Sequence, residues 1–415
     1  MHDFIYKGRK LYCEEADLSE IVSEFGTPLY VYSQRTLLGH LRKLQDAFKG
    51  INPLICYSVK ANSNISILKS LVQEGAGLDI VSGGELYRAL KCGCPAQRIV
   101  YASVGKTELE IEQAIKHNIL FFNVESEPEL ACINRIASRL GRKTRVALRI
   151  NPDVEAKTHK FITTGKITNK FGIDLKTAEG ILRSRKIYRS VDICALHMHI
   201  GSQITEGGPF LAAIKKVADF ALRMAAESGL KLEYLNIGGG LGIIYDKENP
   251  QTALAFSRKV LPILKQSGVK IIMEPGRFIV GNAGILVTRI LYVKKTPLKK
   301  FIILDAGMND LIRPALYGAF HKIEPVLKSS GALEKADLVG PICESGDFIA
   351  KDRRMPRVKQ GDLLAVMSAG AYGFSMSSNY NSRLRAAEVL VKGKQVSLIR
   401  QRENYADLVR NEILV

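Results

Sequence analysis

The stretch PLICYSVKANSNISILKSLVQEGAGLDIVS, residues 53–82, sets the pattern that decides the fold. It begins with a short apolar run that ends in polar residues, PLICYSVK at 53–60. An amphipathic segment follows at 66–75, and a second apolar run, GLDIVS, occupies 77–82. Short apolar runs bounded by turn residues predict buried strands, and the amphipathic segment between them predicts a helix.

The same alternation continues to residue 277 and gives eight predicted strands. Amphipathic segments lie between them, and several open with an acidic residue and close with glycine, as helix ends favour. Strict alternation over eight pairs is typical of a parallel (β/α)8 TIM barrel and suits an open doubly wound sheet less well. The predicted strands occupy 53–60, 77–82, 98–103, 120–126, 145–151, 192–202, 232–240 and 270–277.

The sequence outside this region has a different texture, because its apolar runs are separated by turns and not by regular helices. Such runs occupy 285–295, 301–307, 362–372 and 386–400, and two more lie near the start, at 4–13 and 28–33. We therefore predict a barrel domain over 36–279. A C-terminal β-barrel or sandwich domain is predicted over 280–415, with the N-terminal strands of 1–35 added to it.

The bulk composition indicates a folded protein in a reducing compartment. Hydrophobic residues make up 46% of the 415 residues and charged residues 24%, as in globular domains. Seven cysteines are scattered along the chain without disulfide-like spacing. Cys92 and Cys94 lack a second Cys/His pair, so no metal site is expected. No secretory signal and no long uncharged apolar run is seen, which predicts a cytoplasmic protein without membrane segments.

The formal net charge of +19 raises the possibility of nucleic-acid binding. The basic stretches, at 183–189, 294–300 and 351–359, are interrupted, lie far apart and match no nucleic-acid-binding motif. A solvated surface that attracts small anionic substrates accounts for the charge better, so no nucleic-acid partner is expected.

Polar residues at the predicted strand ends indicate where chemistry takes place, because active sites of such barrels lie at the carboxyl ends of their strands. Lys60 ends an apolar strand, where partial desolvation would make it the nucleophile that a Schiff base needs; a lysine that reaches solvent is the alternative. His197 and His199 share one strand face. No third ligand stands at a metal-binding spacing, so His199 fits either a ring stacked on a planar cofactor or a core histidine.

Two further predicted strands end in residues that suit a binding site: one ends in a glycine-rich run, and the other in two charged residues. The run NIGGGLG, 236–242, contains Gly238, Gly239 and Gly240, whose backbone N–H groups could surround a phosphate; a glycine-rich turn without a ligand is the alternative. Glu274 and Arg277 end the eighth strand, where buried charges must be paired. A purely structural ion pair is equally compatible with these two residues.

Taken in order, several motifs closely resemble those of the diaminopimelate decarboxylase family, and the match runs nearly end to end. The resemblance implies a pyridoxal phosphate (PLP) binding barrel of the alanine-racemase type with a β domain. The motifs are YSVKAN at 57–62, HMHIGSQ at 197–203, NIGGGLG at 236–242, EPGR at 274–277, DAGMNDLIRPALY at 305–317, GPICESGD at 340–347 and GAYGFSMSSNYN at 370–381.

The resemblance also implies cofactor-binding roles. Lys60 would hold PLP as a Schiff base, His199 would stack on its ring, and Glu274 would face the pyridine nitrogen and keep it protonated, so that the ring can accept electrons. The phosphate and the remaining cofactor contacts would fall to Ser202, Gly238, Gly239, Gly240, Gly276, Arg277 and Tyr372.

Substrate roles follow in the same way. Arg313 and Tyr317, four residues apart on a short helix capped by Asn309 or Asp310, would join Arg277 in a clamp for a distal carboxylate. Glu344 would bind the distal ammonium, and Tyr372 would contact both cofactor and substrate. Cys343 would reprotonate the substrate carbon, although an inert buried thiol is the commoner state. In the family the Cys343 and Glu344 positions reach the neighbouring subunit's cofactor, which implies a homodimer with shared active sites.

The resemblance therefore predicts PLP-dependent decarboxylation of meso-2,6-diaminopimelate to L-lysine and carbon dioxide. A related decarboxylase of ornithine, arginine or carboxynorspermidine is the nearest alternative, and the Arg313 and Tyr317 clamp argues against it. A non-catalytic PLP-binding regulator is the second alternative, but such a protein would be expected to lack Lys60 or Cys343.

Overall fold

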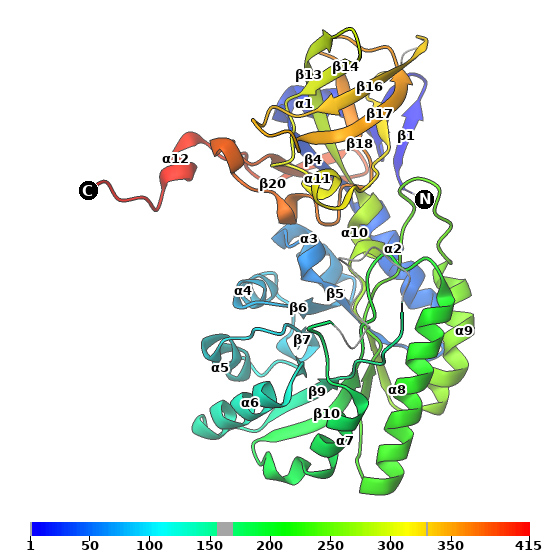
Figure 1. The fold of residues 1–415 in the computed structure, drawn as a ribbon, viewed down its shortest axis with the longest axis vertical. Helices are drawn as coiled ribbons and strands as arrows, with labels where there is room; N and C mark the ends of the chain where they lie inside the picture. The colour runs from blue at the N-terminus through cyan, green and yellow to red at the C-terminus, as the bar shows by residue number, and fades with distance from the viewer. Residues whose placement is uncertain (1, 156–168, 329–330) are drawn as a thin grey trace. The chain divides into compact units, whose positions relative to one another are not determined.

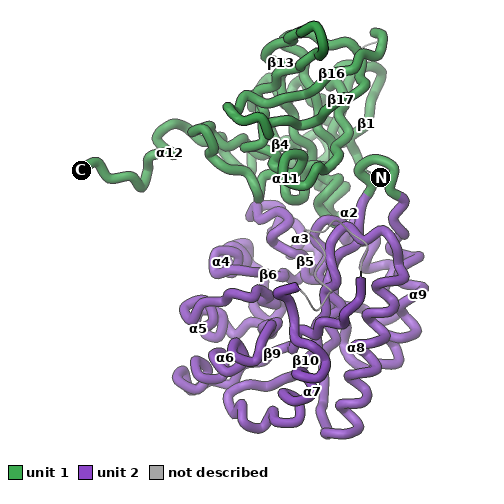
Figure 2. The backbone as a smooth tube through the Cα atoms, in the orientation of Figure 1, with its two compact units in different colours: residues 1–39, 244–248, 279–415 green, residues 40–243, 249–278 purple. Residues whose placement is uncertain are grey.

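A computed structural model describes residues 2–155, 169–328 and 331–415. The chain divides into two units, drawn in separate colours in Figure 2. Unit 1 comprises Met1–Gly39, Ile244–Glu248 and Ile279–Val415, and unit 2 comprises His40–Ile243 and Asn249–Phe278. The predicted domain boundaries at 36 and 279 remain a prediction.

Unit 2 is built around a closed barrel of eight strands, each parallel to its neighbours (Figure 1). Every strand predicted from the sequence between 53 and 277 is present, in the order β10-β11-β12-β5-β6-β7-β8-β9, which confirms the barrel. The bounds are β5 Leu54–Ser58, β6 Gly77–Ile80, β7 Ile99–Tyr101, β8 Phe121–Val124, β9 Thr144–Arg149, β10 Val191–His197, β11 Tyr234–Asn236 and β12 Lys270–Met273.

The helices between these strands begin at residues that suit helix N-termini. Asn64, Ser82, Thr107, Ser126 and Thr252 each cap a helix by accepting a backbone N–H bond through the side chain, which satisfies donors that the helix itself leaves unpaired. The bounds are α3 Ile65–Gln73, α4 Gly83–Lys91, α5 Glu108–Lys116, α6 Glu127–Arg139, α7 Leu175–Arg183, α8 Gly207–Ser228 and α9 Ala253–Gln266. Two further helices flank the barrel strands in sequence: α2 (Gln34–Ala47) precedes β5, and α10 (Arg277–Val280) follows β12.

Unit 1 contains a branched nine-stranded sheet in the order β17-β16-β14-β13-β4-β19-β20, with β18 pairing to both β13 and β15. The fold class, a barrel with a separate sheet domain, is therefore confirmed. The strands are β4 Leu29–Ser33, β13 Gly284–Lys295, β14 Lys300–Leu304, β15 Ile323–Pro325, β16 Leu333–Val339, β17 Phe348–Pro356, β18 Leu363–Val366, β19 Ala387–Lys392 and β20 Gln395–Arg400.

The segment before β4 forms a small sheet of its own, made of β1 (Phe4–Lys7), β2 (Lys10–Cys13) and β3 (Ala16–Asp17), followed by α1 (Leu18–Phe25). Its apolar side chains belong to the same buried cluster as residues of the large sheet, which include Leu29, Ile285 and Val389. The two shorter helices of unit 1 are α11 (Arg313–Tyr317) and α12 (Tyr405–Val409). Within the described ranges, no helix is long and apolar enough to cross a membrane.

The barrel packing can be tested by the same substitution at a buried and an exposed leucine. Leu78 on β6 is fully buried, whereas Leu109 on α5 is 67% exposed. We expect Leu78→Ala to lower the free energy of unfolding by about 2–5 kcal/mol, because it leaves a cavity in a packed core. Leu109→Ala should change it by less than about 0.5 kcal/mol. Urea unfolding followed by circular dichroism measures both, and equal losses would contradict this assignment of the core.

Candidate active site

A buried carboxylate, that of Glu274, lies at the end of β12 and is tied to three other barrel strands. Its Oε1 accepts hydrogen bonds from the side-chain amides of Asn123 (2.9 Å) on β8 and Asn236 (2.6 Å) on β11. Its Oε2 lies 3.1 Å from Nε2 of His197 on β10. All four side chains are at most 5% exposed, so the carboxylate is held in one orientation.

The charge state of Glu274 follows from these neighbours. Burial by itself raises the pKa of this carboxyl group, but His197, Lys60 and the amide of Asn236 outweigh it and hold the pKa well below its usual range. The side chain therefore stays ionised. The sequence analysis found no acidic partner for His197 because Glu274 is distant along the chain. Even so, no group of three or more His, Cys, Asp or Glu side chains that could hold a metal ion occurs in the described part of the chain.

Lys60 lies just after β5, in the short 3-10 turn Val59–Ala61. Its Nζ is 2.6 Å from Oδ2 of Asp79 on β6, and the Ser58 hydroxyl donates to the same oxygen at 2.7 Å. Asp79 is fully buried, and its Oδ1 has no hydrogen-bond partner among the described residues. Asp79 lies within the predicted strand 77–82, but the sequence pattern assigns it no role; its signal is the parallel register that pairs Ser58 with Asp79.

The glycine-rich turn after β11 requires glycine for steric reasons. Gly238 and Gly240 have φ values of 67° and 113°, which favour glycine. A Cβ atom on Gly239 would lie 2.0 Å from the backbone oxygen of Glu274. The N–H groups of Gly238 and Gly239 donate to Asn236 Oδ1 (3.0 Å) and His199 Nδ1 (3.2 Å). The turn is therefore packed directly against the ends of β10 and β12.

His199 lies beside this turn, and Arg277 follows the end of β12. Burial lowers the pKa of His199 well below its usual range, and the charges of Arg149 and Lys60 lower it further, so the imidazole is neutral. Arg277 is buried and donates through Nε and Nη2 to Ser202 Oγ, at 3.4 and 3.2 Å. The neutral ring of His199 therefore contacts the glycine turn, and the Arg277 guanidinium contacts Ser202.

Gly276 lies just before Arg277 and packs against β5. A Cβ atom at this position would come within 3.1 Å of the side chains of Ser58 and Ala61, so the glycine allows the end of β12 to approach the Lys60 turn closely. The barrel residues predicted from the sequence, from Lys60 to Arg277, thus occupy the carboxyl ends of the strands within unit 2.

In unit 1, Arg313 begins α11 and Tyr317 ends it, as predicted, but the predicted cap is wrong. The N-cap is Ile312, with no side-chain capping bond; the Asp310 carboxylate instead turns inward and accepts a bond from Gly307 N at 3.0 Å. Burial raises the pKa of Asp310 to about 7.

Arg313 is buried and has defined neighbours within unit 1. Its Nη1 lies 3.0 Å from His321 Nε2, and its guanidinium stacks over the ring of Tyr245 at 4.6 Å. His321 Nδ1 faces the Met367 carbonyl at 2.8 Å, so Nδ1 carries the proton and Nε2 accepts from Arg313. The predicted clamp joins Arg313 and Tyr317 of unit 1 with Arg277 of unit 2, and it remains a prediction.

The loop that carries Cys343 and Glu344 is held by a buried aspartate. Asp347 accepts backbone N–H bonds from Ile342 and from Met308, both at 2.6 Å. Cys343 and Glu344 themselves are exposed. Cys343 is therefore the exception among the seven thiols, since all the others are buried or partly buried, and the alternative of an inert buried thiol is wrong.

Tyr372 occupies an uncommon backbone conformation, with φ of 58°. A bulky residue in the left-handed region is strained, and such strain is concentrated at functional positions. The predicted contacts of Tyr372 with cofactor and substrate remain a prediction.

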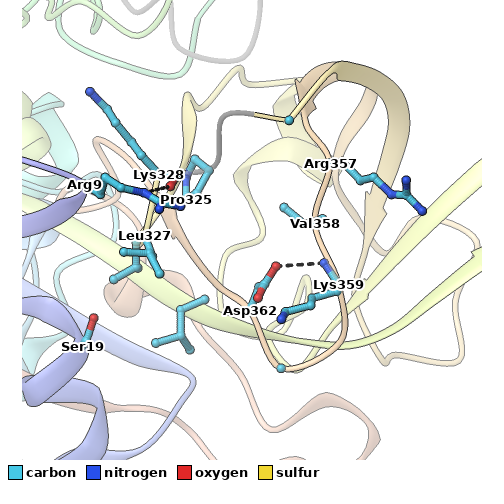
Figure 3. Close-up of a pocket in the computed structure, with 13 residues that line it drawn as sticks. Arg9, Ser19, Pro325, Leu327, Lys328, Arg357, Val358, Lys359 and Asp362 are labelled. Carbon is cyan, nitrogen blue, oxygen red and sulfur yellow. Dashed lines mark hydrogen bonds between the residues drawn. The ribbon is translucent and has the colours of Figure 1, made fainter.

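Unit 1 also contains a hollow of about 580 Å³, which is lined by residues that include Arg9, Lys328, Arg357 and Lys359 (Figure 3). Lys328 and Arg357 extend to opposite sides of it, and Arg9 Nε donates to the Lys328 carbonyl at 3.0 Å. None of the residues predicted to act in catalysis lines this hollow.

Comparisons with known proteins agree with this geometry. The sequence model of the family described as "Pyridoxal-dependent decarboxylase, pyridoxal binding domain" matches residues 34–281. The diaminopimelate decarboxylase of Aquifex aeolicus is 49% identical over 405 residues, which cover 97% of this chain and 96% of that protein. The enzyme of the same name from Pseudomonas aeruginosa is 46% identical, with 100% of both chains covered.

Solved structures show the same relationship. Diaminopimelate decarboxylase from Helicobacter pylori, complexed with L-lysine, is 43% identical with a TM-score of 0.92, covering 95% of this chain and 99% of that one. The enzyme from M. jannaschii, in co-complex with L-lysine, is 38% identical with a TM-score of 0.95, covering 100% and 99%. The sequence identity, the coverage and the shared barrel together show that this chain belongs to the diaminopimelate decarboxylase family of pyridoxal-dependent decarboxylases.

Proposed function

We propose that this chain catalyses the decarboxylation of meso-2,6-diaminopimelate to L-lysine and carbon dioxide, with pyridoxal phosphate as its cofactor. The observation that carries the proposal is the ionised, fully hydrogen-bonded Glu274 at the barrel mouth, in a chain whose relatives are named for this reaction. The solved relatives with L-lysine, the product of that reaction, support it.

The residues of unit 2 fit pyridoxal phosphate. A primary amine (Lys60), a neutral imidazole (His199) and a held carboxylate (Glu274) are the groups that an aldehyde, an aromatic ring and a pyridine nitrogen require. Arg277 with Ser202 supplies donors for a phosphate. Asp79 Oδ1, a buried oxygen without a partner among the described residues, shows that the polar groups around Lys60 are not fully satisfied by the chain itself.

The chemistry that the cofactor supplies is an electron sink for the pair left behind when the α-carboxylate departs as carbon dioxide. Glu274, kept ionised by its donors, would hold a proton on the ring nitrogen. Asp79 would orient the Lys60 amine, and His197 would act through Glu274 as a positioning residue. His199 would cover one face of the bound ring and exclude water from it.

Substrate recognition would depend on groups from both units. Arg277, Arg313 and Tyr317 would bind the distal carboxylate of the substrate, since guanidinium groups bind carboxylates in a bidentate manner. Glu344 would pair with the distal ammonium. Such a set of charges selects a substrate that carries both an amine and a carboxylate at its far end.

We further propose a homodimer with shared active sites, in which Cys343 and Glu344 serve the partner subunit's site and Cys343 delivers the proton to the substrate carbon. The exposure of both residues supports this arrangement, because within one chain their loop leaves them uncovered. We place the reaction in the cytoplasm, because all seven cysteines are free thiols.

Carbon dioxide release tests the reaction and its substrate together. Purified protein with added pyridoxal phosphate should release carbon dioxide from meso-diaminopimelate and not from ornithine, arginine or lysine, because those three lack a distal carboxylate. Lys60→Ala should abolish release, because the amine that binds the cofactor is gone. Release from ornithine or arginine would contradict the proposed clamp, and silence on all four substrates would contradict the proposed reaction.

The glycine turn allows a test of cofactor binding with a matched control. Gly239→Ala places a Cβ atom against the Glu274 backbone, and we expect it to weaken binding of pyridoxal phosphate by about tenfold or more, which is about 1.4 kcal/mol. Gly180→Ala on α7 meets no atom within 4 Å and should bind as the wild type does. Absorbance titration of each apo-protein with the cofactor measures this, and equal affinities would contradict the role of the turn.

Shared active sites predict complementation between two inactive variants. Lys60→Ala and Cys343→Ala should each be inactive as homodimers. When equal amounts of the two variants are mixed and exchange subunits, half of the dimers should be hybrids. Each hybrid has one intact site out of two, so about a quarter of wild-type activity should return. Exchange should be verified by mass spectrometry, and hybrids without activity would contradict the sharing of sites.

A further inference from the structure

The last segment of the described chain, 401–415, leaves the strands of unit 1 and runs away from them (Figure 1). Its helix, α12, is defined by local bonds: the Asn404 side chain accepts from the N–H groups of Ala406 (2.9 Å) and Asp407 (3.3 Å). The Asp407 carboxylate accepts from Asn404 N at 2.9 Å. This reciprocal capping stabilises the helix without help from the sheet.

Large apolar side chains along this segment are mostly exposed among the residues that the structure describes. Tyr405 is 77% exposed, Val409 53%, Ile413 87% and Leu414 102%. Tyr405 and Val409, four residues apart, lie on one side of α12. Such a concentration of exposed apolar side chains in a short segment marks a surface that contacts another molecule, because scattered single residues are the ordinary case.

The segment is close to neutral in charge. Residues 404–415 contain Asp407, Glu412 and Arg410, and Arg410 is paired with Asp407. Apolar contact, and not charge, would therefore bind the segment to another molecule.

The root of the segment is connected to the loop that carries Cys343 and Glu344. Glu403 Oε2 accepts from Asn379 Nδ2 (2.6 Å) and from Arg385 N (2.8 Å). In the same stretch, 379–385, the Asn381 side chain accepts from Cys343 N (2.8 Å) and Tyr380 Oη lies 3.4 Å from Glu344 Oε2. The segment therefore starts from the part of unit 1 that presents Cys343 and Glu344.

We propose that residues 404–415 form an arm that docks onto a second copy of this chain and holds the dimer together beside the shared active sites. Burial of Tyr405, Val409, Ile413 and Leu414 would supply the apolar contact. The inference rests on the homodimer proposed above and identifies the segment that stabilises it.

The test is the dimer dissociation constant of the full chain with its cofactor, measured by sedimentation equilibrium. The arm variant is the double substitution Ile413→Asp with Leu414→Asp, which changes two exposed side chains and should not disturb folding. The matched control is Leu298→Asp, at a side chain that is 94% exposed in the turn between β13 and β14. Circular dichroism verifies that all three proteins have the same secondary structure.

We expect the dissociation constant of the arm variant to rise by about a hundredfold or more, since buried apolar anchors dominate such contacts, while the control matches the wild type. Activity of the arm variant should fall on dilution and return at high concentration. An arm variant that dimerises as tightly as the wild type would overturn the arm, leave the homodimer standing, and assign the segment to a different partner. A wild-type protein that is monomeric at every concentration would overturn both the homodimer and the arm.

Discussion

The burial of one carboxylate, that of Glu274, is the constraint on which the rest of this structure depends. A buried ionised carboxylate without partners is strongly destabilising, so its oxygens need donors with fixed geometry. Asn123, Asn236 and His197 provide them from three different strands. These donors meet only if the barrel closes in the observed strand order and register. The closed barrel therefore brings these donors together around the carboxylate.

The neighbouring features follow from that arrangement. The turn at Gly238–Gly240 approaches the backbone of Glu274 so closely that no side chain fits. Lys60 is brought near by the register of β5 with β6, which also places Asp79 against it. An amine, a carboxylate and a neutral imidazole thus stand at the carboxyl ends of β5, β12 and β10, and the pyridoxal phosphate of this family requires this set of groups.

Much of this was predictable from the sequence, and the failures have physical reasons. The eight barrel strands are largely buried on both faces and mostly apolar, so short apolar runs identify each of them. The strands β16 and β17 were missed because charged residues interrupt their apolar runs; β17 is an edge strand of the sheet, where charge prevents unwanted pairing. The predicted cap of α11 failed because Asp310 bonds to Gly307 within its own turn.

The pairs His197 with Glu274 and Lys60 with Asp79 depend on register between strands, which no local pattern encodes. The residue roles, the domain boundaries and the shared dimer remain predictions.

The most direct test of the central claim is decarboxylation of meso-diaminopimelate by Glu274→Gln under saturating substrate and cofactor. The side chain keeps its size but loses its charge, so the protein should fold and attach its cofactor at Lys60. We predict that kcat falls by about a hundredfold or more, because a neutral amide cannot hold the proton on the ring nitrogen. A kcat within about tenfold of the wild type would contradict the claim that the buried carboxylate controls the reaction.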